Sequence, residues 1–476
     1  MNQIYPFPRV ESRNANELQI STWVGTGTRY SARKFSAFRM FSASTSYTRI
    51  TWILVSTPLF GLVSVVLPSF IPLQNPLSGP STNVGFWLHL SACVLIVSMG
   101  TVLHIRAGAE ISLQLYSHSE AFRASVATTI LYSAFGYGVA SIWRFPVPDF
   151  WIVGAPAWLS LLLVTHAIIL WRKLRSPNDL ILRLRLYAPA IIQSVQVVLY
   201  PAFSILFDKV DTNFQIVLTL DFPLLKFAAR RLLKRFTRSL KDFSAEVAVS
   251  GVEICSSLYQ SAIMQSAPSK AAMSVLLGVE VVQGVVSLRL FMDKPTIVSR
   301  QKLLDSAEDI LTGKETTLCT QSKHAIVEQA LHLMIVAESL VLVEYFEVAI
   351  PLLNACFIAI ASSLPSVVYN PKLCRFHYHP ALLIDAVSSI LLYTLLQGLS
   401  LVAMHMIMKI RYGISGVRLL AFILTHHWES IIGKLMGWVV VILYLPVIHY
   451  GIDFSFKFDY IATMQQQQRM CQSLDS

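Results

Sequence analysis

Charged side chains are scarce in this sequence, and their scarcity excludes an ordinary soluble fold. Only 14% of the 476 residues are charged, whereas a soluble domain usually carries about 25%. Hydrophobic residues make up 54% of the chain, and its mean hydropathy is +0.57. The apolar residues also fall in blocks of roughly 20, the length that a helix needs to cross a bilayer. These features predict an all-α, polytopic helical membrane protein.

Motifs of common enzymes and metal sites are also missing. The chain has no phosphate-binding loop, HExxH or G-x-S-x-G signature, and its six cysteines form no CxxC or Cys/His pattern. We therefore expect neither a disulfide framework nor a zinc site, and we predict no catalytic residue, metal or cofactor. The pairs His377/His379 and His426/His427 lack a complete ligand set, so we interpret them as solvated loop or interface histidines.

Acidic residues are missing from most of the N-terminal segment. Residues 1–50 contain none after Glu17, are rich in Ser, Thr and Arg, and lack the apolar core of a signal peptide. This composition is typical of a disordered cytosolic arm before a first transmembrane helix. A mitochondrial transit peptide is the alternative. We expect a cytosolic N-terminus and an integral membrane location, with the plasma membrane as the preferred compartment.

Apolar segments follow the arm at lengths that suit membrane spans. The clearest are 51–72, 84–104, 125–143, 150–171 and 187–207. Lys and Arg crowd the loop after the fourth span, whereas the loop between the first two carries no charge, so basic loops are expected on the cytosolic side. With the more polar helices further along, we predict roughly ten to twelve transmembrane or re-entrant helices.

Composition divides the chain into regions of different character. These are a basic arm (1–50), apolar spans (51–228), an interfacial helix (229–243), polar spans (244–292), a cytosolic loop (293–324), acidic and apolar spans (325–452) and a C-terminal tail (453–476). Helix interruptions are expected at Asp221 and Pro223, and again at Pro351, because proline removes a backbone donor.

The segment 229–243 alternates cations and apolar residues at helical spacing. A rotation of about 100° per residue gathers its cations on one face and its leucines and phenylalanines on the other. The cations are Arg230, Arg231, Lys234, Arg235, Arg238 and Lys241. We predict a helix at the bilayer surface that binds anionic lipid headgroups. Nucleic acid is not expected, since spans flank the segment, and a homo-oligomer is compatible with the pattern.

Carboxylates interrupt several of the apolar segments. The set comprises Asp221, Glu246, Glu253, Glu280, Glu338, Glu344, Glu347 and Asp385. An ionised side chain at the bilayer centre costs about 2.5–3.5 kcal/mol on insertion scales, so these helices must be shielded from lipid. Helical geometry places Glu344 and Glu347 on one face and Glu338 opposite them. Lys226 and Arg289 are the nearest candidates for neutralising cations.

Three functions are compatible with this pattern. The favoured one is a transporter or channel in which the carboxylates line a route for protons, cations or a small cationic solute. A receptor or scaffold that binds a cytosolic partner is the main alternative, and a lipid-modifying enzyme is a weaker one. Against any pathway stands a structural interpretation, in which the carboxylates only form hydrogen bonds or ion pairs between helices.

Four stretches also carry a resemblance to a known family. They are "LYPAFSILFDKV", "EYFEVAIPLL", "SSLPSVVYNP" and "VIHYGIDFSFKF". As an ordered set they resemble a large family of multi-pass membrane proteins of oomycetes, over most of the chain from the first span onward. The E-x5-E-x2-E pattern of Glu338, Glu344 and Glu347 is similar to an acidic pattern of that family. The resemblance implies a membrane fold and assigns no activity or residue roles.

Overall fold

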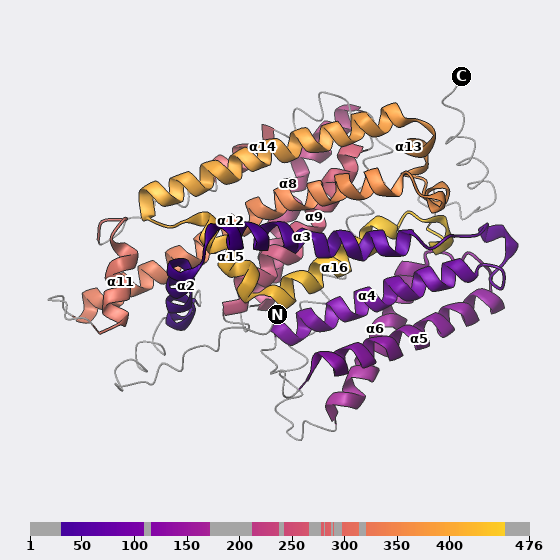
Figure 1. Cartoon of the computed structure of the whole chain (residues 1–476), viewed down its shortest axis with the longest axis horizontal. Helices are drawn as coiled ribbons and strands as arrows, with labels where there is room; N and C mark the ends of the chain where they lie inside the picture. Colours follow the sequence, from indigo (N-terminus) through magenta and orange to yellow (C-terminus); the bar gives the residue numbers. More distant parts are fainter. Residues whose placement is uncertain are drawn as a thin grey trace.

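The computed structural model of this chain is helical wherever it describes the residues. It describes residues 30–108, 116–171, 212–237, 242–265, 278–279, 281–286, 289, 298–313 and 320–452. Within these ranges the regular elements are α-helices and short 3-10 turns, as the composition predicts (Figure 1).

Four helices in the described ranges are long and apolar enough to cross a membrane. They are α3 (Tyr47–Ser69), α4 (Val84–Gly108), α5 (His118–Ile142) and α14 (Pro380–Tyr412). The prediction of ten to twelve spans is therefore wrong for the described part of the chain. Some of the expected spans are polar or short helices, and the span expected at 187–207 lies outside the described residues.

The spanning candidates expose apolar faces to the surroundings. On α3 the large exposed side chains include Leu59 and Val63, and on α14 they include Leu395, Leu399 and Val402. Contiguous exposed apolar surface of this kind is expected where a protein meets another apolar phase. These faces indicate that α3 and α14 contact lipid.

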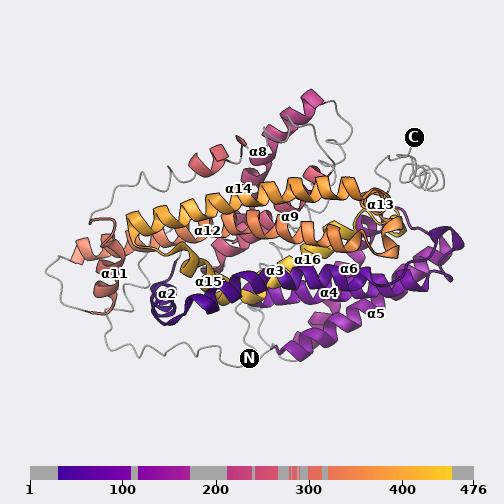
Figure 2. The same cartoon turned by 45° about the horizontal axis from the view of Figure 1, so that its top comes forward.

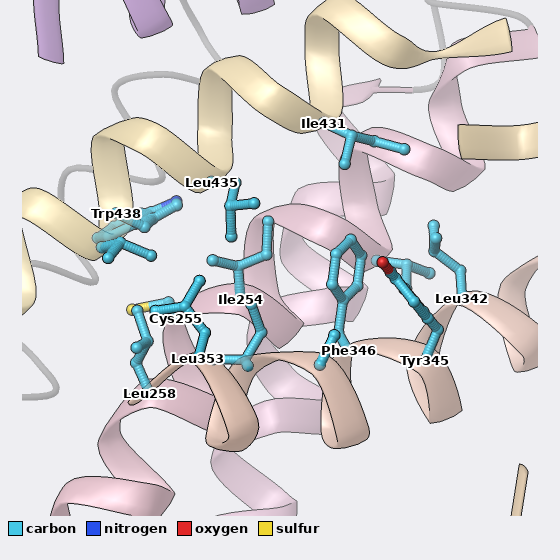
Figure 3. Close-up of a cluster of buried hydrophobic side chains, with 14 of the residues drawn as sticks. Ile254, Cys255, Leu258, Leu342, Tyr345, Phe346, Leu353, Ile431, Leu435 and Trp438 are labelled. Atoms are coloured by element: carbon cyan, nitrogen blue, oxygen red, sulfur yellow. The ribbon is translucent and has the colours of Figure 1, made fainter. Parts of the chain in front are cut away.

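Helices with buried charged side chains occupy the interior. They are α9 (Ser244–Gln265), α12 (Thr320–Ala361) and α16 (Trp428–Tyr444), which lie between the outer helices in two views (Figures 1 and 2). Their apolar side chains meet in one buried cluster, with Ile254 from α9, Phe346 from α12 and Leu435 from α16 (Figure 3). The outer helices thus shield the polar ones from lipid.

The remaining helices and turns complete the bundle. They are α2 (Ala32–Ser44), α6 (Phe150–Trp171), α8 (Thr212–Phe236), α11 (Leu303–Leu311), α13 (Cys374–Tyr378), α15 (Gly416–His426) and the 3-10 turns η1 (Pro76–Ser78), η3 (Pro365–Tyr369) and η4 (Ile448–Tyr450). In both views α2, α11 and α15 gather at one end of the bundle and α13 lies at the other. Local signals set several helix ends, such as the capping box of Ser117 and Glu120 that begins α5.

The described part of the basic arm is helical, which corrects the prediction of a disordered arm over 1–50. Ser31 caps α2, because its Oγ accepts a hydrogen bond from the backbone N of Lys34 at 3.0 Å. The same hydroxyl donates to Asp242 Oδ2 at 2.6 Å. The anchor comes from a position 211 residues away, so the local composition could not reveal it.

The helix interruptions expected at two prolines are absent. Helix α8 continues through Asp221 and Pro223, and α12 continues through Pro351. A proline removes one backbone hydrogen bond, and neighbouring helices can hold the remaining turns in place. Helix α8 also runs into the segment predicted as a separate interfacial helix, and it ends at Phe236.

One cysteine departs from the expectation that disulfides are absent. Cys374, the first residue of α13, is disulfide-bonded, whereas Cys93, Cys255 and Cys356 are free thiols. The spacing of cysteines along the chain could not indicate this bond, because the pairing depends on which segments meet in the fold.

Candidate functional site

Helix α9 carries a line of polar side chains through the interior of the bundle. Glu246, Ser250, Glu253, Ser257 and Gln260 are each at most 1% exposed. Three of them recur at intervals of seven residues, so they lie along one face of the helix. The helices around this face include α8 and α16, whose cations meet the carboxylates of α9, and α12, which adds a carboxylate of its own. Polar groups buried in this way need hydrogen-bond or ionic partners.

The first of these partners is a lysine of α16. Lys434, itself 4% exposed, donates from Nζ to Glu246 Oε1 at 2.7 Å. Ser430 donates to Glu246 Oε2 at 2.9 Å, and the Ser250 hydroxyl lies 2.7 Å from both Oε1 and the backbone carbonyl oxygen of Glu246. Because the Ser430 hydroxyl has only one hydrogen, the Nδ1 of His104, 3.0 Å away, must be the donor to it. The Glu246 carboxylate is thus surrounded by donors.

A second buried pair lies at the end of the bundle where α2 docks. The Nζ of Lys34 donates to Glu338 Oε1 at 2.8 Å and to Oε2 at 2.9 Å. It also lies 3.0 Å from Nε2 of His427. Lys34 is 2% exposed and Glu338 is 0% exposed.

A third group joins α8, α9 and α12. The Nζ of Lys226 lies 2.8 Å from Glu347 Oε1 and 3.3 Å from Glu253 Oε2, and all three side chains are buried. Nη2 of Arg230 lies 2.7 Å from Glu253 Oε1. Lys226 is therefore the neutralising cation that the sequence suggested, whereas Arg289 is exposed.

The two faces predicted for α12 match these contacts. Glu338 meets Lys34 of α2, whereas Glu347 meets Lys226 of α8. Glu344 is 5% exposed and lies near the segment 281–286, since a Cβ on Gly284 would be 3.8 Å from its Oε1. The carboxylates of α12 therefore do not converge on one cavity.

The remaining predicted carboxylates lie elsewhere. Asp385 is exposed on α14, so it takes no part in the buried groups. The side chain of Asp221 and the whole of Glu280 lie outside the described residues.

The cations predicted to lie at the membrane surface are divided between two environments. Arg230 is only 27% exposed and pairs with the buried Glu253, which corrects its assignment to a lipid-binding face. Arg231 and Arg235 are exposed on α8, as that assignment requires. The side chain of Lys234, and the residues Arg238 and Lys241, lie outside the described residues.

The interpretation of the histidines as solvated is wrong for His427. This residue is 1% exposed and contacts Lys34 and Glu338 between α15 and α16. No signal near it in the sequence could have identified it, because its partners are 393 and 89 positions away. Lys434 was not among the expected neutralising cations, and the structure places it inside α16, which begins at Trp428.

The described residues contain no group of three His, Cys, Asp or Glu side chains placed to hold a metal ion. Among the buried carboxylates, Glu246, Glu253, Glu338 and Glu347 each contact a lysine instead.

No protein-family model, curated protein or solved structure matches the chain. The class of the protein therefore rests on its own architecture. Four candidate spans with exposed apolar faces, closed around buried polar helices, indicate a multi-pass helical membrane protein.

Proposed function

We propose that the protein moves protons or small cations across a membrane along the polar face of α9. The observation that carries this proposal is the line from Glu246 through Glu253 to Gln260, which is buried over its whole length. Ionisable side chains inside a membrane bundle are costly and usually belong to a pathway for ions or protons. The line also extends from Glu246 to Gln260 along α9 rather than forming one local contact.

The buried carboxylates are equal in number to the cations beside them, which suits a pathway in which a mobile proton or cation replaces one of these cations. In the three groups, Glu246, Glu253, Glu338 and Glu347 face a matching set of cations, namely Lys34, Lys226, Lys434 and Arg230. Lys226 lies between two carboxylates at unequal distances of 2.8 and 3.3 Å. A cation held between two anions can shift toward either of them, and a mobile proton or cation can take its place at the other.

Static ion pairs are the competing explanation, because such pairs also hold membrane helices together. A protein with this structural role alone would act as the receptor or scaffold that the sequence also allowed. The two explanations differ in one measurable property, since only the pathway predicts flux through the purified protein.

Two further proposals concern the lipid contacts of the protein and its family. Arg231 and Arg235, exposed on α8, are positioned to bind anionic lipid headgroups. We also propose membership of the oomycete family, supported by the ordered set of four sequence stretches.

Neutralising one carboxylate of the third group should reduce flux. In proteoliposomes that carry a proton or potassium gradient, Glu253→Gln and Glu347→Gln are each expected to slow transport by about tenfold or more, which corresponds to a barrier raised by about 1.4 kcal/mol. Glu344→Gln should act in the same direction. Flux is measured with a pH-sensitive or potassium-sensitive dye trapped in the vesicles.

Asp385→Asn is the matched control, because it removes an exposed carboxylate from α14. Its flux should equal that of the unmodified protein. Normal flux in both Glu253→Gln and Glu347→Gln, at equal amounts of folded protein, would contradict the pathway. An unmodified protein that passes neither ion would favour the scaffold.

A further inference from the structure

The ammonium group of Lys34 occupies a buried site with the features of an ammonium-binding pocket. Its three hydrogens face four acceptors: the two Glu338 oxygens at 2.8 and 2.9 Å, Nε2 of His427 at 3.0 Å and the backbone carbonyl of Asp242 at 3.2 Å. The ring of Tyr30 lies 4.9 Å from the nitrogen, within the range of a cation–π contact. The surrounding groups thus match both the charge and the hydrogens of this cation.

The occupant and the acceptors come from different parts of the fold. Lys34 belongs to α2, whereas Glu338 lies in the middle of α12 and His427 directly precedes α16. Helix α2 also makes aromatic contacts that do not involve the ammonium group of Lys34. Phe38 packs edge-on against Phe422 at 5.6 Å.

The outer side of α2 is held by an ion pair at the surface. Arg39 meets Asp305 and Glu308 of α11 at 2.7 and 2.6 Å, and these three side chains are between 31% and 64% exposed. Exposed ion pairs contribute little to stability, typically about 0–1 kcal/mol. The α2 helix is therefore anchored chiefly by its buried lysine and phenylalanines and by the hydrogen bonds of its capping residue, Ser31, to Asp242.

We propose that Glu338, His427 and the Asp242 carbonyl form a binding site for a primary ammonium group, which Lys34 fills as a tethered occupant. The ligand class is the ammonium ion or a small primary alkylamine. An alkali cation has no hydrogen to donate to the imidazole nitrogen, and a quaternary ammonium has none to donate at all. Entry of a free ligand requires that Lys34 withdraws, so the structure with α2 docked is the occupied form of the site.

The proposed site defines the class of cation that the pathway would carry, and only this assignment rests on the transport proposal. Binding at the site can be measured without flux. Amine binding in a protein that passes no ion would support the binding site and contradict only the transport proposal. Flux without amine binding would contradict the site alone.

The test is chemical rescue of a variant that lacks the tethered cation. Lys34→Ala should lower the Tm of the full-length protein in detergent, because Glu338 is left buried without its cation. Ethylammonium chloride should then raise the Tm progressively with concentration, as expected for a ligand that binds only the folded state. Ammonium should act likewise, whereas tetramethylammonium and potassium chloride at equal ionic strength should not.

Arg39→Ala is the matched control, because it removes a cation of α2 from an exposed pair. Its Tm should not depend on ethylammonium. A folded Lys34→Ala protein whose Tm is unaffected by ethylammonium and ammonium would overturn the proposal, and so would equal rescue by potassium.

If Lys34→Ala does not fold, the unmodified protein provides the deciding measurement. Trypsin cuts after lysine, and the buried Lys34 should be protected while α2 is docked. Ethylammonium should compete with Lys34 and increase cleavage of the Lys34–Phe35 bond, measured by mass spectrometry, whereas tetramethylammonium should not. A cleavage rate that ethylammonium leaves unchanged would overturn the proposal.

Discussion

Replacing Lys226 with methionine should lower the free energy of unfolding by about 3–5 kcal/mol, the usual effect of breaking a buried ion pair. Lys226 is 0% exposed and is shared by Glu253 and Glu347, which are at most 4% exposed. Methionine fills a similar volume but carries no charge. Two carboxylates would then remain in the interior without the lysine that they share, and the desolvation of these charges is the main penalty.

The unfolding free energy can be measured by denaturation in mixed micelles. Lys409→Met provides the control, because Lys409 is exposed at the end of α14 and its loss should change stability by less than about 0.5 kcal/mol. Adding Glu347→Gln to Lys226→Met should recover part of the loss, since a neutral amide replaces a buried anion that has lost its lysine. A Lys226→Met protein as stable as the Lys409→Met protein would contradict the assignment of Lys226 as the shared cation.

Replacing Gly433 with alanine should separate α16 from α4 and destabilise the protein by about 1–3 kcal/mol, the usual effect of overpacking. The two helices touch backbone to backbone at Gly433 and Gly100. A Cβ atom on Gly433 would meet the Gly100 carbonyl oxygen, and it would lie 3.0 Å from the backbone N of His104. Both obstacles are backbone atoms of α4, so a side-chain rearrangement cannot relieve the clash.

Gly437, one turn further along α16, is the matched control. A Cβ atom there would meet no other atom within 4 Å, so Gly437→Ala should be neutral or stabilise the helix by about 0.5–1 kcal/mol. Thermal unfolding of both variants in the same detergent measures the difference. Equal stability of the two would show that α4 and α16 are not in backbone contact at Gly433.

The Gly433 contact and the Lys226 ion pair differ in how far the sequence could predict them. Lys226 could be proposed as a partner, because it is a cation within an apolar segment close to several carboxylates. The role of Gly433 could not be proposed, because a glycine in a helix is equally compatible with open space, as Gly437 shows. Only the packing of α4 against α16 distinguishes these two positions.

The sequence by itself determined the helical membrane class and much of the helix placement. The predicted segment 150–171 coincides with α6, and the polar region predicted to begin at 244 begins with α9. It also placed Glu338 opposite Glu344 and Glu347, because a residue's position on a helix follows from the helical rotation alone. These properties are local, and apolar periodicity records them directly.

The tertiary structure alone decided which polar groups meet and which helices face lipid. Lys34 and Glu338 are 304 residues apart, and the composition around Lys34 predicted a disordered arm. The number of spans was overestimated because hydropathy cannot tell a polar helix inside a bundle from one that faces lipid. In both cases the free energy of burying a charge beside its partner decides the outcome. This contribution arises only when distant segments are brought together.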